Sequence, residues 1–210
     1  MARDESVVAE VVAPNTQAHG RILPALIEQA LERAQASWDD VEGLAVSIGP
    51  GSFTGLRIGL SLAKGIAYAG HLPIAAVSTL EALAWAADPS SGDHVWAILD
   101  ARMREVYAAS FERTATGLVR RTPDEALRPD ALAPRIPATA VVIGDAVETY
   151  PLLATSGARV LPFATHHPRG GIVARLGATI LQSGGGADVG TLEPTYVRPS
   201  QAELAHTHKR

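Results

Sequence analysis

The chain has 210 residues, of which 47% are hydrophobic and 19% are charged, and its formal net charge is −4. This composition is typical of a globular protein with one or two cores, and it argues against a stand-alone nucleic-acid binder, which needs a dense basic surface. The absence of cysteine excludes disulfides and thiolate zinc sites. No apolar run has the length of a membrane span or follows a basic signal-peptide start, which predicts a cytoplasmic protein without membrane contact.

The first half of the chain alternates between expected strands and helices. Residues 7–12 read as a strand, and residues 44–48 read as a short buried one. Between them, a helix beginning between Thr16 and Pro24 carries apolar side chains at i, i+3, i+4 spacing: Ile22, Leu23, Leu26, Ile27, Ala30, Leu31 and Ala34. Another helix starts at a capping box formed by Ser78 and Glu81. This alternation predicts an α/β fold.

The most informative stretch, from Ile48 to Arg57, joins a strand to a helix of small residues. Gly55, Gly59, Ala63 and Ala67 recur every fourth position and share one helical face. Glycine in a helix interior costs about 1 kcal/mol relative to alanine, so we expect close packing of this face against a helix or sheet to offset that cost.

A glycine-rich turn before a helix can also bind phosphate, through free backbone N–H groups and the helix dipole. The P-loop spacing is not matched here, Leu56 replaces the required lysine, and Pro50 lacks an N–H. The sequence therefore favours a packing or partner-docking loop over nucleotide binding, with Ser52 and Thr54 as helix caps rather than nucleophiles. The loop comprises Gly49, Pro50, Gly51, Ser52, Phe53, Thr54 and Gly55.

The polar segment 88–93 predicts a domain boundary, with a first domain at 1–88, a second at 93–200 and a polar tail at 201–210. In the second domain we expect a hairpin around residues 101–104, a loop with a short helical turn at 122–137, a strand at 140–143 and a helix at 172–181.

No catalytic or metal-binding set stands out. His166, His167, His206 and His208 lie in expected loop and tail segments, without the spacing of a metal helix. Asp100 and Glu105 flank Arg102 and Arg104, where charges that stabilise a turn are the simpler interpretation.

The string G-P-G-S-F-T-G-L-R-I-G resembles the TsaB (YeaZ) family of bacterial tRNA threonylcarbamoyladenosine biosynthesis proteins. Further family-like pieces follow in order: residues 19–24 upstream, then 73–83, 99–102 with 105–107, 144–145, and 194–198. The resemblance implies the actin-like ATPase (ribonuclease H-like) superfamily fold with two sub-domains.

Family members open with two strands before the region in which this chain begins. Residues 1–6 resemble the end of the second of these strands and its turn. The resemblance therefore implies an N-terminally truncated first sub-domain, in which the strand at 44–48 lacks a neighbour.

The resemblance also implies a non-catalytic scaffold that needs no cofactor of its own. It would pair with the catalytic paralogue TsaD through the first two helices, be joined by the ATPase TsaE, and meet tRNA indirectly; ATP and metal would bind to the partner subunits. A homodimer through the same helices, an actin-like-fold kinase and a peptidase are the alternatives. The expected partner-binding residues lie on both helices: His19, Leu23, Leu26, Ile27, Ala30, Arg57, Ile58, Gly59, Leu62, Ala63 and Ile66. Hydrogen bonding at the helix start is the simpler role for His19, and an intramolecular ion pair is the alternative for Arg57.

Overall fold

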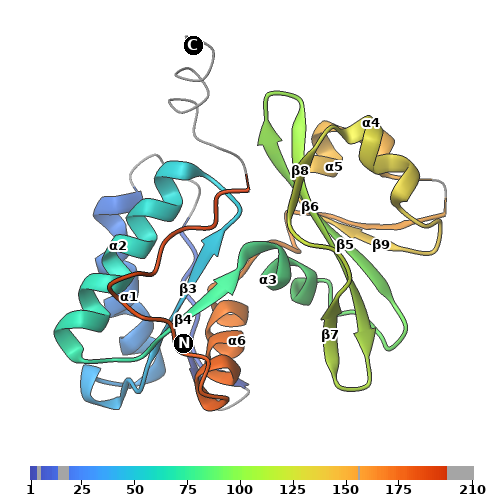
Figure 1. Ribbon diagram of the computed structural model, residues 1–210. Coiled ribbons are helices and arrows are strands. Elements are labelled where there is room, and N and C mark those ends of the chain that lie inside the picture. The colour runs from blue at the N-terminus through green and yellow to red at the C-terminus, as the bar shows by residue number, and fades with distance from the viewer. Residues whose placement is uncertain (4–5, 14–18, 156, 198–210) are drawn as a thin grey trace, which may run out of the picture. The chain divides into compact units, whose positions relative to one another are not determined.

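The computed structural model describes residues 1–3, 6–13, 19–155 and 157–197, and it divides them into two compact units (Figure 1). Unit 1 contains Met1–Ser78 and Pro168–Pro194. Unit 2 contains Thr79–His167 and, of the described residues that follow unit 1, Thr195–Val197.

This division differs from the expected boundary at 88–93. Helix α3 (Thr79–Ala86) packs on strands of unit 2, and helix α6 (Gly170–Gln182) returns to the sheet of unit 1. The polar segment that suggested a boundary is a loop within unit 2, where Asp93 accepts a hydrogen bond from the Ser90 N–H at 2.9 Å. Turn-forming residues therefore marked a loop here rather than a linker. The expected tail at 201–210 lies outside the described residues.

The sheet of unit 1 contains two parallel strands, β3 (Leu44–Gly49) and β4 (Ile74–Ser78). Helices α1 (His19–Ala34) and α2 (Phe53–Gly70) lie on one side of these strands and α6 lies on the other (Figure 1). Parallel strands need cover on both faces, which explains their apolar sequences. Helix α6 approaches very closely, because a Cβ at Gly177 would lie 2.2 Å from the Cβ of Ala45.

The N-terminal region departs from expectation at one point. The strand expected at 7–12 is not formed; a short antiparallel pair, β1 (Ala2–Arg3) and β2 (Ser6–Val7), ends before Val8. Helix α1 begins at His19, within the expected range, and Pro24 lies inside it, so one backbone hydrogen bond of that helix is missing. A single 3-10 turn, η1 (Trp38–Asp40), precedes β3.

Unit 2 is built on a mixed sheet with the strand order β10-β9-β5-β6-β7, in which β8 also pairs with β6. Its central hairpin, β5 (His94–Arg102) and β6 (Glu105–Thr114), turns where the sequence predicted. The remaining strands are β7 (Gly117–Arg120), β8 (Glu125–Leu127), β9 (Val141–Ile143) and β10 (Arg159–Leu161). The predictions at 140–143 and 172–181 are confirmed by β9 and α6, whereas β7, β8 and β10 were not foreseen.

Alternation along β5 supplies both cores of unit 2. Val95 and Ala97 face one cluster, which α3 covers with Leu80 and Leu83. Trp96 faces the other cluster, with side chains from the short helices that follow. These are α4 (Pro129–Leu132), η2 (Ala133–Arg135), α5 (Ala146–Thr149) and η3 (Pro151–Leu153). The period-two pattern thus indicates a sheet that is buried on both faces.

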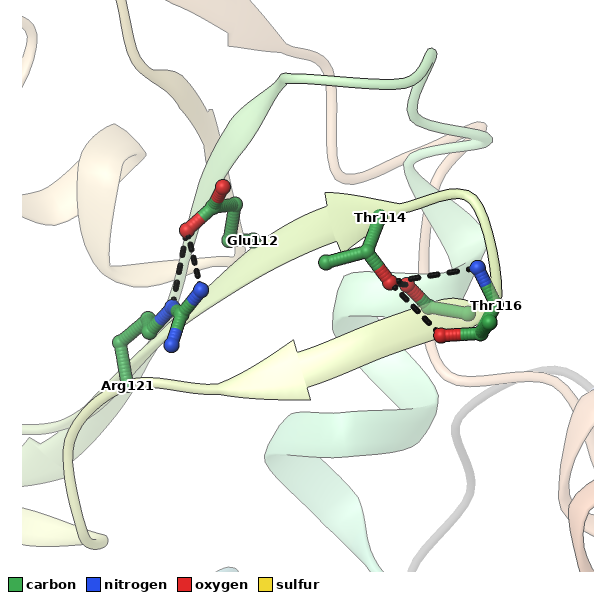
Figure 2. A network of polar contacts seen from close by, with 5 residues as sticks. Glu112, Thr114, Thr116 and Arg121 are labelled. Carbon is green, nitrogen blue, oxygen red and sulfur yellow. Dashed lines mark hydrogen bonds and ion pairs between the residues drawn. The ribbon is translucent and has the colours of Figure 1, made fainter.

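Hydrogen bonds from side chains stabilise the turn between β6 and β7 (Figure 2). Thr114 Oγ1 donates to the Gly117 carbonyl at 3.0 Å and accepts from the Thr116 N–H at 3.3 Å. Beyond the turn, Arg121, the residue after β7, donates from its Nε to Glu112 Oε2 of β6 at 2.8 Å.

Candidate partner-binding surface

Helices α1 and α2 lie side by side and border a shallow, open hollow near the start of α1. Gly20 faces the Ile58 side chain there, since a Cβ at Gly20 would lie 3.5 Å from it, an ordinary contact distance. The hollow has a volume of about 490 Å³ and is lined by Gly20, Arg57, Ile58, Ser61 and Leu62. Such a hollow can receive a side chain from another protein.

Aromatic side chains are exposed at both ends of α2. Phe53 is 40% exposed, and the Arg57 guanidinium lies over its ring, 4.2 Å from the ring centroid. Tyr68, in the last turn, is 79% exposed. Aromatic and arginine side chains are enriched in protein interfaces, so the composition of this face is typical of one.

A larger groove of about 1220 Å³ runs between α1, α2, β3 and α6. Apolar side chains of α1 and small or apolar residues of α2 form much of its wall: Leu23, Leu26, Ile27, Ala30, Gly59, Leu62, Ala63 and Ile66. Along this groove, β3 pairs with β4 on one side only, as far as the described residues go.

The structure therefore divides the expected partner-binding residues between two places. Ile58 and Arg57 lie at the hollow, Leu62 lines both places, and the other described members line the groove. The side chain of His19 lies outside the described structure. The small-residue stripe divides as well, since Ala67 is buried at 1% exposure while a Cβ at Gly59 would meet open space. Gly20 and Ser61 were missed because neither residue type signals an interface by itself.

The loop before α2 caps the helix. Ser52 Oγ accepts a hydrogen bond from the Gly55 N–H at 3.3 Å, and the Ser52 carbonyl accepts one from the Leu56 N–H at 2.9 Å. These contacts confirm the capping role expected for Ser52. They also occupy N–H groups that a phosphate would use.

In unit 2, two carboxylates lie close together at the β5–β6 hairpin. Asp145 Oδ1 accepts a hydrogen bond from the Asp100 N–H at 2.8 Å, and Asp100 pairs with Arg102 at 3.3 Å. Burial, with a contribution from the charge of Asp100, raises the pKa of Asp145. Glu105 forms no metal cluster with them; in the described part of the chain, no three His, Asp or Glu side chains are placed to hold a metal ion. Asp100 Oδ1 also accepts the Arg102 N–H at 2.8 Å, so this carboxylate orders the turn, as the sequence indicated.

None of the described helices combines the length and the apolar character needed to cross a membrane.

A family model described as "TsaD: tRNA N6-adenosine threonylcarbamoyltransferase" matches residues 6–148. The chain is 37% identical to the tRNA threonylcarbamoyladenosine biosynthesis protein TsaB of Escherichia coli over 67% of its own length and 63% of that protein. The chain belongs to the TsaD family, within its TsaB (YeaZ) group. The Bacillus subtilis TsaB is 34% identical over 60% of this chain and 54% of its own length. This chain thus spans less than two thirds of the curated relatives that it matches first.

The solved structure of YeaZ from Pseudomonas aeruginosa has the same fold as this chain, with a TM-score of 0.77 at 24% identity. The match covers 88% of this chain and 86% of that one. The fold match and the family match together confirm the expected α/β, actin-like fold class.

Proposed function

We propose that this chain is a non-catalytic subunit in the biosynthesis of threonylcarbamoyladenosine in tRNA. It binds and activates a TsaD-like catalytic subunit, which transfers a threonylcarbamoyl group to the adenosine beside the anticodon. The observation that carries the proposal is membership of the TsaB group, whose curated members are named for this pathway. ATP and metal then belong to the TsaD-like subunit and a TsaE-like ATPase, tRNA is contacted through these partners, and the complex works in the cytoplasm.

The proposed contact with the TsaD-like subunit is the face of α1 and α2 that carries the hollow beside Ile58 and the exposed Phe53–Arg57 pair. An apolar side chain of the partner that filled this hollow would be removed from water at the centre of the contact, which is where binding energy concentrates in interfaces. The polar rim is then supplied by Arg57 and Ser61.

The experiment fills the hollow without disturbing the core. Ser61→Arg places a long charged side chain there from an exposed position, and the matched control Ser91→Arg makes the same change in an exposed turn of unit 2. We expect the dissociation constant for the TsaD-like subunit to rise at least about tenfold, or about 1.4 kcal/mol, for the first variant only. Calorimetric titration measures this, and circular dichroism checks that both variants are folded.

Modification of tRNA by the reconstituted complex should fall in parallel with binding, because the proposed role is activation. A catalytic subunit that works at full rate without this chain would contradict the proposal.

ATP titration of the isolated chain separates a scaffold from an actin-like-fold kinase, since saturable binding with turnover would favour the kinase. Sedimentation of the isolated chain tests whether the same helices form a homodimer.

A further inference from the structure

After α6, the chain forms a strap, residues 187–194, that passes from one side of the unit 1 sheet to the other. Gly185 closes α6 through a hydrogen bond from its N–H to the Ile180 carbonyl at 2.8 Å. The Ala187 N–H then donates to the carbonyl of Ile74, the first residue of β4, at 2.8 Å. From there the strap, coloured dark red in Figure 1, continues to α2.

A compact turn sets the shape of the strap. Asp188 Oδ1 accepts hydrogen bonds from the N–H and the hydroxyl of Thr191, at 2.8 and 3.1 Å. The Asp188 carbonyl accepts the Leu192 N–H at 2.9 Å. This turn brings the carbonyls of Gly190 and Leu192 to the same side chain of α2.

That side chain is Lys64, whose ammonium donates to the Gly190 carbonyl at 3.2 Å and to the Leu192 carbonyl at 2.9 Å. Lys64 and Arg57 are the two charged residues of α2, and Lys64 is half-buried. Placing an ammonium group there is favourable only if its lost water contacts are replaced, and the two carbonyls replace them.

We propose that Lys64 is a clasp that fastens the strap to α2. The strap starts from α6, on one side of the β3–β4 sheet, and ends at α2 on the other, so the clasp ties the two helical layers around the outer edge of β4. Lys64 is thus a positioning residue of the fold. The proposal does not rest on the proposed function of the chain.

Hydrogen exchange of individual amides tests the clasp in the full chain. Lys64→Met keeps the aliphatic stem but removes the donors, and we expect the amides of Ala187 and Leu192 to exchange at least tenfold faster. Asp188→Ala breaks the turn from the other side without touching α2, so it should release the same amides even if the first variant folds poorly. Arg57→Met removes the other cation of α2 and should leave the strap unchanged.

Exchange at Ala187 and Leu192 within twofold of the wild type in a folded Lys64→Met variant would overturn the clasp, whatever Asp188→Ala does. Equal acceleration of the amides in the strap and in β3 would also overturn it, because Lys64 would then support unit 1 as a whole rather than the strap. Selective release of the strap, with unchanged amides in β5 and β6 of unit 2, is the supporting result.

Discussion

Glu10 shows how a residue with no recognisable motif can hold two distant segments together. Its carboxylate accepts the Gly171 N–H at 2.8 Å and the Arg169 Nε–H at 2.6 Å, at the start of α6. The N-cap of α6, Arg169, makes no side-chain capping bond of its own. Glu10 therefore caps a helix that lies about 160 residues further along the sequence, at the end where a negative charge is favourable.

Glu10→Gln keeps an oxygen that can accept the Gly171 N–H but removes the negative charge at the start of α6, so it should lower the free energy of unfolding by about 0.3–1 kcal/mol. Burial works to raise the pKa of Glu10, but the hydrogen bonds from Gly171 and Arg169 outweigh it and the pKa lies below its ordinary value of 4.5. A lowered pKa means that the stabilisation is present above pH 4.5 and is lost as the pH falls further. Urea denaturation at several pH values measures both effects. The exposed Glu32→Gln, the same change in α1, is the control; an equal loss there would remove the capping interpretation.

Asp145 presents the opposite case, a carboxylate in an unfavourable position. Burial is the main cause of its raised pKa, followed among the raising effects by the nearby charge of Asp100. Asparagine keeps an oxygen for the Asp100 N–H and removes the charge. Asp145→Asn should therefore unfold at a higher urea concentration at pH 7.

Proton linkage sets the pH dependence of this stability difference. A raised folded-state pKa makes the charged form unfavourable above that pKa, and the disadvantage disappears as Asp145 gains its proton at lower pH. The advantage of asparagine should therefore vanish in acid. Asp145→Ala, which leaves the Asp100 N–H without its acceptor, should be less stable than the wild type at every pH. Equal destabilisation by asparagine and alanine would show that the charge itself is needed.

Among the helices, the small-residue face of α2 is packed at one end and open at another position. Ala67 is buried at 1% exposure, whereas Gly59 faces the open groove. Ala67→Leu should destabilise the chain by about 1–3 kcal/mol through overpacking. Gly59→Ala should stabilise it by up to about 1 kcal/mol, because alanine favours the helix and meets no neighbour. Thermal unfolding of both variants distinguishes these effects, and a loss of stability at Gly59 would mean that the groove is closed in solution.

Local patterns predicted most elements because their causes are local. The i, i+3, i+4 stripe of α1 and the continuous apolar run 95–99 in β5 follow from burial on one face and on two faces, respectively. Elements held by distant partners were missed: β8 depends on pairing with β6, and the domain boundary depends on α6 returning to β3 and β4. The candidate surface was predictable in its helices but not in its division between hollow and groove.

Gly144 illustrates the same limit at one position. Its φ is +130°, and a Cβ there would lie 1.8 Å from the Ile98 carbonyl oxygen. The sequence contains the glycine, but only the packing of β9 beside β5 explains why no other residue fits.

At the scale of the whole molecule, the apolar core is distributed unequally between the two units. Both clusters of buried hydrophobic residues found in the described chain lie in unit 2. Among the largest fully buried side chains of the described residues, Ile74 and Val77 belong to unit 1 and the others to unit 2. Since apolar burial is the main favourable term in folding, unit 1 has the smaller reserve of stability.

Unit 1 should therefore unfold before unit 2 as urea is added. Trp85 and Trp96 both belong to unit 2, where Trp96 is 6% exposed, so tryptophan fluorescence reports on that unit once Trp38 of unit 1 is replaced in the Trp38→Phe variant. Circular dichroism follows the long helices α1, α2 and α6, all of which belong to unit 1. The helical signal should fall at a lower urea concentration than the tryptophan fluorescence changes, whereas coincident transitions would show that the units unfold together. A saturating TsaD-like subunit that binds to α1 and α2 should move the first transition to higher urea and bring it closer to the second, because a ligand stabilises the unit that it binds.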